Sequence, residues 1–297
     1  MLYPKNQTAQ LDDALFQKPT CEYRGAPFWA WNCKLDRDML LQQILYLKEM
    51  GFGGFHMHVR TGMATPYLSQ EYMDLIRSCV DKAEDEEMLA WLYDEDRWPS
   101  GAAGGLVTKD PQYRQRFVLF TREERTDNVE KDQAVATGKP WLMACFDILL
   151  NPDGTLADYR QIAPSDAAEG KKWYAYVCTP KSNPWYNNQT YIDTMSPEAV
   201  QAFIKLTYEG YKAQIGDRFS KTVPAIFTDE PQFSYKETLP FATDETDVKL
   251  PWSMDVPETF QKAYGDDIVA HFPELIWDLP DGAVSIHRYH YHDHLAE

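Results

Sequence analysis

The chain has 297 residues, 44% hydrophobic and 25% charged, a composition typical of a globular protein with one large domain or two smaller ones. Its formal net charge of −17 would repel phosphate backbones and anionic lipids, so we expect neither a nucleic-acid nor a membrane partner. The sequence opens without a basic segment followed by an apolar run, and no stretch approaches about 18 apolar residues, which predicts a cytoplasmic protein. The five cysteines form no CxxC pair and indicate free thiols.

Apolar, strand-like runs alternate with amphipathic helical patterns over the first hundred residues. The predicted order is a strand at 27–32, a helix over 36–51, a strand at 53–60, a helix over 69–88 and a strand at 88–96. Asp36 and Ser69 are typical helix N-caps, and Gly51 is a typical helix end. Short connections between alternating strands and helices predict a parallel sheet or a (β/α) barrel.

Polar side chains follow each of these three predicted strands. They are Asn32; His56, His58 and Arg60; and Asp94, Glu95 and Asp96. In (β/α) barrels the active-site groups lie at the carboxyl ends of the strands. The pattern therefore predicts one site to which all three segments contribute.

β-rich segments interrupt the alternation after the third strand. Residues 110–190 are predicted to form a β-rich insertion, after which a helix over 196–215 and a strand at 223–231 continue the barrel. The predicted domains are 1–109, 110–190 and 191–297. Four strand–helix units can be counted, where a closed barrel has eight. We therefore expect an incomplete TIM-type α/β barrel whose remainder lies in a longer chain.

The sharpest motif is FTDEP at 227–231, in which an apolar strand runs directly into Asp229, Glu230 and Pro231. The proline ends strand pairing and leaves two carboxylates at the strand end. Cleavage of a glycosidic bond needs one carboxyl group as acid and another as base or nucleophile, and aromatic surroundings can raise the pKa of the acid. We therefore predict Glu230 as a catalytic carboxylate, with Asp229 tuning or orienting it.

A second acidic motif, YDEDRWPSGAAGG at 93–105, follows the third predicted strand. Alternation along a strand puts Asp94 and Asp96 on one face and Glu95 on the other. Such carboxylates can hold sugar hydroxyls or a calcium ion, so calcium is the cofactor that this motif would suit. The alternative is a loop in which the acids pair with Arg97.

The third motif is His56-x-His58-x-Arg60, which alternation places on one strand face. An HxH pair at a barrel strand end can hold a transition metal, but we favour binding of sugar hydroxyls. Five further histidines lie towards the end of the sequence: His271, His287, His290, His292 and His294. The tract at 287–294 could bind metal adventitiously, although a polar helix face is the favoured interpretation.

Aromatic residues make up 14% of the chain, with 9 Trp and 18 Tyr, and indole rings pack well against the C–H faces of sugars. The candidate platforms are Trp29, Trp31, Trp98, Trp185 and Trp252. Trp29 and Trp31 alternate along one strand, so they share a face and could equally pack inside the barrel.

Four segments together resemble the barrel of large bacterial glycoside hydrolases, close to the rhamnosidase-type family 106 and its uncharacterised relatives. They are PFWAWN at 27–32, LKEMGFGGFHMH at 47–58, WLYDEDRWPSGAAGG at 91–105 and FTDEP at 227–231. The resemblance spans residues 25–105 and 222–232. It implies a (β/α)8 barrel with appended β-domains, carboxylates at strand ends, and a calcium ion in rhamnosidase members. By position it makes Glu230 one catalytic carboxylate and places the other on a strand beyond this chain.

The expected function is hydrolysis of an O-glycosyl bond in an oligosaccharide or glycoside. Glu230 and Asp229 are the catalytic candidates, and the expected sugar contacts are Trp31, Asn32, His56, His58, Arg60, Asp94, Glu95 and Trp98. Two alternatives remain: a metal-dependent amidohydrolase-like barrel that uses His56 and His58, and a carbohydrate-binding protein without catalysis.

Overall fold

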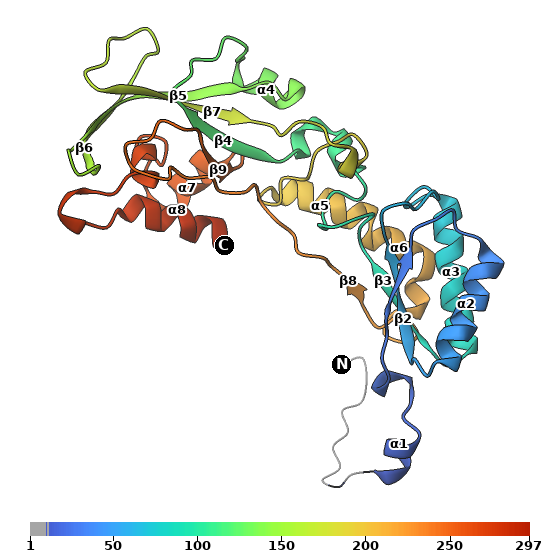
Figure 1. The fold of residues 1–297 in the computed structure, drawn as a ribbon. Coiled ribbons are helices and arrows are strands. Elements are labelled where there is room, and N and C mark those ends of the chain that lie inside the picture. Colours follow the sequence, from blue (N-terminus) through green and yellow to red (C-terminus); the bar gives the residue numbers. More distant parts are fainter. Residues whose placement is uncertain (1–9, 11) are drawn as a thin grey trace. The chain divides into compact units, whose positions relative to one another are not determined.

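The computed structural model describes residues 10 and 12–297, which form two compact units (Figure 1). Unit 1 comprises the described residues up to Val107 together with Pro184–Asn188 and Val200–Pro231. Unit 2 comprises Thr108–Asn183, Gln189–Ala199 and Gln232–Glu297. The chain therefore passes between the units several times, and each unit is built from segments distant in sequence.

Unit 1 contains a four-stranded parallel sheet with the strand order β1-β2-β3-β8. Its strands are β1 (Phe28–Trp31), β2 (Gly54–Val59), β3 (Leu89–Tyr93) and the short β8 (Ile226–Phe227). Its helices are α1 (Asp13–Gln17), α2 (Arg37–Glu49), α3 (Gln70–Asp85) and α6 (Tyr208–Ile215), and α5 (Pro197–Leu206) leads into unit 1 along the chain. Successive strands are neighbours in the sheet, as in a barrel wall.

The helix boundaries follow from capping side chains. The carboxylate of Asp36 accepts a hydrogen bond from the Met39 N–H at 2.9 Å, and the Ser69 hydroxyl accepts one from the Tyr72 N–H at 3.2 Å. Gly51 follows α2 with φ +89°, a conformation that glycine adopts without strain.

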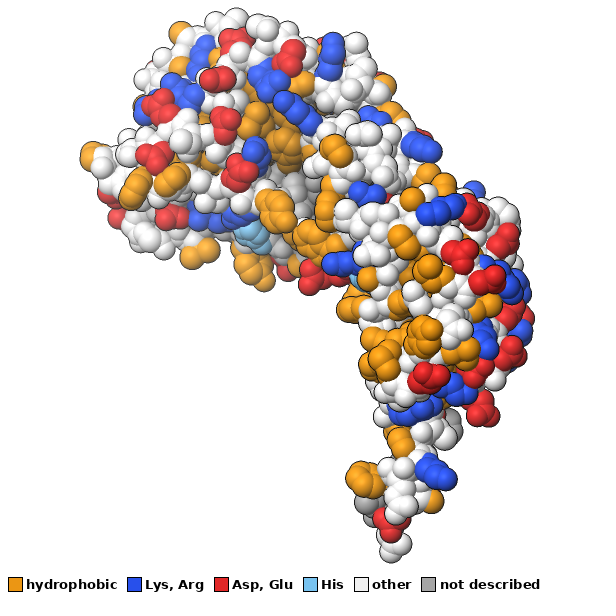
Figure 2. Space-filling model, turned by 45° about the vertical axis from the view of Figure 1, so that its right-hand side comes forward, with side chains coloured by type: hydrophobic (Ala, Val, Ile, Leu, Met, Phe, Trp, Pro, Cys, Tyr) orange, Lys and Arg blue, Asp and Glu red, His pale blue; other side chains and the backbone are white. Residues whose placement is uncertain are grey.

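Charged side chains of both signs lie intermixed on the surface of the molecule that Figure 2 shows.

Alternation along the strands gives the sheet of unit 1 two different faces. One face packs on the helices through buried apolar side chains, among them Trp31, Phe55, Met57, Val59, Ala90 and Leu92. The other face carries mainly aromatic and imidazole rings: Phe28, His56, His58, Trp91, Tyr93 and Phe227. Phe28 is 56% exposed on this second face. We name it the ring face.

Unit 2 contains a five-stranded antiparallel sheet with the strand order β6-β5-β7-β4-β9. Its strands are β4 (Arg116–Thr121), β5 (Trp141–Leu150), β6 (Leu156–Ile162), β7 (Lys171–Cys178) and β9 (Val248–Trp252), and its helices are α4 (Lys131–Thr137), α7 (Val256–Tyr264) and α8 (Ile286–Ala296). The buried core between this sheet and the C-terminal helices is rich in large rings, including Phe120, Phe146, Trp173, Trp252, Phe272 and Trp277.

The expected fold class is confirmed at the level of a mixed α/β protein with a parallel sheet, whereas no closed barrel occurs among the residues that the structure describes. The sequence assigned 191–297 to the barrel, but only Val200–Pro231 returns to unit 1. The rest packs in unit 2 because β9 pairs with β4, and Trp252 and Trp277 fill the core of that unit. Of the described helices, none has the length and apolar character needed to cross a membrane.

Candidate functional site

A cleft of about 600 Å³ opens near the carboxyl ends of the parallel strands of unit 1. The lining residues are Phe28, Ala30, His58, Val59, Arg60, Thr61, Arg97, Trp98, Trp185, Phe227 and Asp229. The lining thus combines two indoles, two guanidinium groups, an imidazole and a carboxylate. Residues from β1, β2 and β8 reach it, together with the loop that follows β3.

The loop after β3 fixes the two carboxylates of the FTDEP motif. The Ser100 N–H donates to the Asp229 carbonyl oxygen, and the Asp229 N–H donates to the Ser100 hydroxyl oxygen, both at 2.8 Å. The Trp98 indole N–H donates to a Glu230 carboxylate oxygen at 2.9 Å. The Tyr93 hydroxyl donates to the Asp229 carboxylate at 3.2 Å. Two motifs 130 residues apart therefore form one structure.

Backbone geometry gives Glu230 an unusual position. Its φ of +44° lies in the left-handed region, which non-glycine residues seldom occupy. The residue is exposed, and its carboxylate is held by Trp98, whose side chain lines the cleft. Strained backbone of this kind is often found at functional sites.

Asp94 and Glu95 are buried in unit 1 and do not line the cleft, and their carboxylate oxygens accept hydrogen bonds within the protein. Asp94 is buried and accepts hydrogen bonds from the hydroxyls of Ser100 at 2.6 Å, Tyr208 at 2.8 Å and Thr228 at 2.8 Å. Burial raises the pKa of the Asp94 carboxyl group, while these hydroxyl donors lower it. Asp94 therefore ties the end of β3 to the residue that follows β8.

Glu95 is the centre of the glycine-rich loop. Its carboxylate accepts backbone N–H groups of Asp96, Gly101, Ala103 and Gly104 at 2.5–2.9 Å, and the residue is 1% exposed. The loop can wrap so closely because Gly104 has φ +63°. Burial raises the pKa of Glu95, and the four N–H donors oppose that rise. A calcium ion at Asp94 and Glu95 would have to displace these donors.

The two histidines of β2 belong to the ring face. The His56 ring donates from Nδ1 to the Ala26 carbonyl oxygen at 3.1 Å and stacks on Trp91 with 5.0 Å between ring centroids. The His58 ring stacks on Phe28 at 4.6 Å and lies 4.0 Å from the Tyr93 ring. In the part of the chain that the structure describes, neither histidine lies within a cluster of three metal-ligating side chains.

His58 is held in its neutral form at ordinary pH. It is 3% exposed, and burial, followed by the nearby charge of Arg60, lowers the pKa of its imidazole to about 4. Its Nε2 lies 3.4 Å from an Arg60 guanidinium nitrogen, and a neutral imidazole can accept a hydrogen bond from that N–H group. A neutral imidazole beside a cleft can exchange hydrogen bonds with sugar hydroxyls.

We expect the depressed His58 pKa to make the stability of unit 1 fall with acidification. In the unfolded chain the His58 side chain takes up a proton near pH 6.5, whereas in the folded chain it does so only near pH 4. The free energy of unfolding that His58 contributes above pH 6.5 is therefore lost as the pH falls from 6.5 to 4. The expected loss at pH 5 is about 2 kcal/mol. Denaturant unfolding at pH 7 and pH 5 measures it, and His58→Gln should remove this part of the pH dependence. An equal slope in both proteins would contradict the assignment.

The remaining predicted site residues lie in the cleft, in the interior or, for Asn32, on the surface outside the cleft. Arg60 and Trp98 line the cleft. Asn32 is exposed after β1 but is not among the lining residues. Trp31 is 1% exposed and packs edge-on against Tyr72 on the helix side of the sheet, so its ring has no face open to a sugar. Trp252, another candidate platform, is fully buried in unit 2.

Among the lining residues, Phe28 and Arg97 had no sequence signal that assigned them to the site, whereas Trp185 was a predicted platform. Arg97 lines the cleft, with its guanidinium carbon 6.0 Å from the centre of the Trp185 ring. Trp185 in turn donates its indole N–H to the Trp98 carbonyl oxygen at 2.6 Å. Phe28 was detectable only as the residue that alternates with Trp29 and so points to the opposite face.

No protein-family model and no curated protein matches this chain significantly. Among solved structures, the chain is similar to a rhamnosidase from Novosphingobium sp. PP1Y, with a TM-score of 0.51 and 11% sequence identity. The match covers 96% of this chain and 44% of that chain, so this chain spans less than half the length of the neighbour. At this identity the likeness shows the fold alone and nothing about activity or substrate.

Proposed function

We propose that the cleft of unit 1 binds a glycoside and that its strand-end carboxylates hydrolyse an O-glycosyl bond. The observation that carries the proposal is the joining of Trp98, Asp229 and Glu230 at the carboxyl ends of parallel strands, beside a cleft of about 600 Å³. Such edges are where barrel enzymes place catalytic groups. The distant likeness to a rhamnosidase fold supports the same class of reaction.

The lining groups fit a sugar by their chemistry. Trp98 and Trp185 offer indole faces to C–H groups, and Arg60, Arg97 and Asp229 offer donors and an acceptor to hydroxyls. We assign Glu230 as general acid or base, because its carboxylate is exposed and oriented by the Trp98 indole. Asp229, which lines the cleft, tunes or orients Glu230 in this proposal.

Asp94, Glu95, His56 and Trp31 have supporting roles in this proposal. Their polar or ring atoms contact other parts of unit 1, so we expect them to shape the cleft without touching the sugar. Calcium remains an expectation from the acidic motif at 93–105 and from the family resemblance.

Hydrolysis of a panel of nitrophenyl glycosides, including the α-L-rhamnoside and a uronide, tests the proposal, with sugar binding followed by tryptophan fluorescence. We expect one member to release nitrophenol and the corresponding free sugar to change the fluorescence. Binding without release would favour a carbohydrate-binding protein. The sequence adjacency of Asp229 and Glu230 is compatible with that alternative, because the two acids of a glycosidase usually flank the scissile bond from separate positions. The absence of both sugar binding and nitrophenol release would contradict both functions.

Trp185→Ala is expected to weaken sugar binding about tenfold, because the exposed ring fixed by the Trp98 carbonyl is the most accessible platform in the cleft. A calorimetric or fluorescence titration measures the change. Tyr46→Ala is the matched control, since Tyr46 lies on α2, is 52% exposed and does not line the cleft. Equal affinities in the two variants would remove Trp185 from the binding site.

A further inference from the structure

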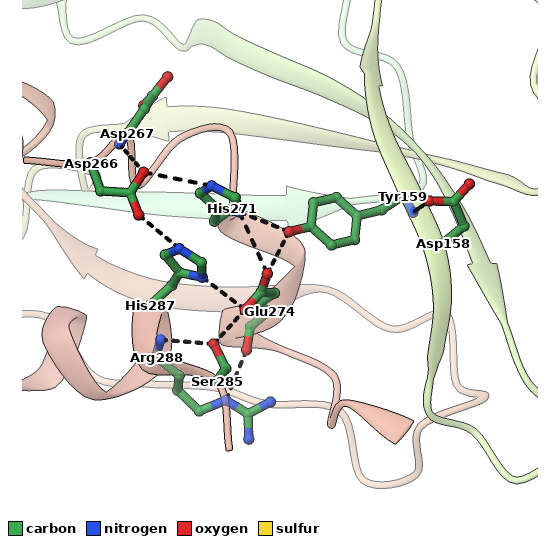
Figure 3. Close-up of polar contacts among 9 residues, drawn as sticks. All are labelled: Asp158, Tyr159, Asp266, Asp267, His271, Glu274, Ser285, His287 and Arg288. Carbon is green, nitrogen blue, oxygen red and sulfur yellow. Dashed lines mark hydrogen bonds and ion pairs between the residues drawn. The ribbon is translucent and has the colours of Figure 1, made fainter. Parts of the chain in front are cut away.

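A cluster of imidazole and carboxylate groups lies in unit 2, apart from the residues of the cleft (Figure 3). Asp266 follows α7, His271 precedes the short 3-10 helix η6 (Phe272–Leu275), Glu274 lies within η6, and His287 lies in the first turn of α8. Tyr159 reaches the cluster from β6. Ligand atoms of Asp266, His271 and His287 all lie within 4.8 Å of one another.

The Nδ1 atoms of both imidazoles are anchored by the same carboxylate. His287 donates from Nδ1 to a Glu274 oxygen at 2.9 Å. His271 donates from Nδ1 to the Tyr159 hydroxyl oxygen at 2.9 Å, and that hydroxyl donates to the other Glu274 oxygen at 2.5 Å. The two rings are stacked, with 3.7 Å between centroids and 4° between planes. Figure 3 shows both rings between Asp266 and Glu274.

This anchoring leaves both Nε2 atoms facing one carboxylate. His287 Nε2 lies 2.8 Å from Asp266 Oδ2, and His271 Nε2 lies 3.6 Å from Asp266 Oδ1. Ligand atoms bound at about 2.1 Å to one metal ion are roughly 3.0–3.4 Å apart in octahedral or tetrahedral geometry. The two observed separations bracket that range. The rings are stacked in parallel, so at least one of them must rotate out of the stack for both Nε2 lone pairs to point at the same ion.

We propose that Asp266, His271 and His287 form a binding site for a divalent transition metal of the zinc class. Two imidazoles and one carboxylate are a ligand set that proteins use for zinc and its first-row neighbours, with further positions filled by water. Asp266 has a side chain 40% exposed and His271 one 32% exposed, so an ion can enter from solvent.

Glu274 and Tyr159 supply the outer hydrogen bonds that such sites need. Metal-binding histidines usually donate their other N–H to a carboxylate or a comparable acceptor, which fixes the tautomer and the ring. The Glu274 carboxylate accepts hydrogen bonds from His287, Ser285 and Tyr159 at 2.5–2.9 Å. The bound ion would link the loop after α7, η6 and α8.

Titration of the complete, EDTA-treated chain with Zn²⁺ by calorimetry, and with Co²⁺ by absorption spectroscopy, tests the site. We expect one strongly bound ion per chain and a rise in the melting temperature on addition of Zn²⁺. His271→Ala and Asp266→Asn should weaken binding more than 100-fold, and Glu274→Gln should weaken it about 10- to 100-fold.

The double variant His290→Ala/His294→Ala is the matched control, because these residues are four apart on α8 and could bind metal by themselves. It should retain the full affinity. Binding lost in the double variant but kept in His271→Ala would overturn the proposal, as would absence of binding to the unaltered chain. That second result would leave the cluster as a hydrogen-bond network that joins the loop after α7, η6 and α8. Circular dichroism identifies variants that do not fold, and the near-isosteric Asp266→Asn then decides.

Discussion

Replacing Glu230 by glutamine is expected to lower kcat on a cleavable glycoside by at least about 100-fold, with KM changed by less than about threefold. The amide keeps the size of the side chain and can accept the Trp98 hydrogen bond, but it can neither donate an acidic proton nor remove one. The loss should therefore appear in turnover. Initial rates on the nitrophenyl glycoside, measured on the complete protein, give both constants.

Glu209→Gln is the matched control, since Glu209 is an exposed carboxylate on α6 of the same unit whose partner is Lys212. It should leave both constants within about twofold. Less than tenfold loss of kcat in Glu230→Gln would argue against catalysis by this residue. Unchanged sugar affinity in a chain without turnover would identify a binding protein.

Local sequence signals predicted the first part of unit 1 well. Asp36 and Ser69 cap the helices as expected, and the strand runs appear as β1, β2 and β3 within a few residues of their predicted bounds. The success has a physical cause. These elements are contiguous in sequence, and their capping and hydrophobic periodicity depend on near neighbours.

Pairing between distant segments was beyond such signals. The aromatic segment before α7 contains β9, whose partner β4 lies more than 120 residues earlier. The insertion was predicted to be β-rich, but the pairing of β6 with β5 within it was not predicted. A strand with a distant partner has no local marker that tells which sheet it joins. The assignment of 191–297 to the barrel failed for this reason.

The candidate site shows the same division. The sequence placed His58, Arg60, Trp98 and Asp229 near one another, and all four line the cleft. The sequence could not distinguish a carboxylate that faces the cleft from one whose oxygens accept hydrogen bonds inside the protein. Adjacent acids differ completely in this respect, because the direction of each side chain depends on how the loop after β3 turns.

Glu95 is the clearest example, and its replacement by alanine is expected to destabilise unit 1 by at least about 4 kcal/mol. Four backbone N–H groups, those of Asp96, Gly101, Ala103 and Gly104, would lose their acceptor inside the protein. Each unsatisfied buried donor costs about 1–3 kcal/mol, and partial entry of water keeps the sum near the lower end. Denaturant unfolding of the variant and the unaltered chain measures the difference.

The location of the first increase in hydrogen exchange distinguishes loss of the Glu95 hydrogen bonds from a general loss of packing. Ser100 and Trp98 of the same loop hold Asp229 and Glu230, so hydrogen exchange should accelerate first at Gly101, Ala103 and Gly104, and sugar binding should fail with it. Glu49→Ala, at the exposed end of α2, should change stability by less than about 0.5 kcal/mol. Glu95→Ala with unchanged exchange in the loop would mean that water replaces the carboxylate. The cleft would then owe its shape to Asp94 and its three hydroxyl partners instead.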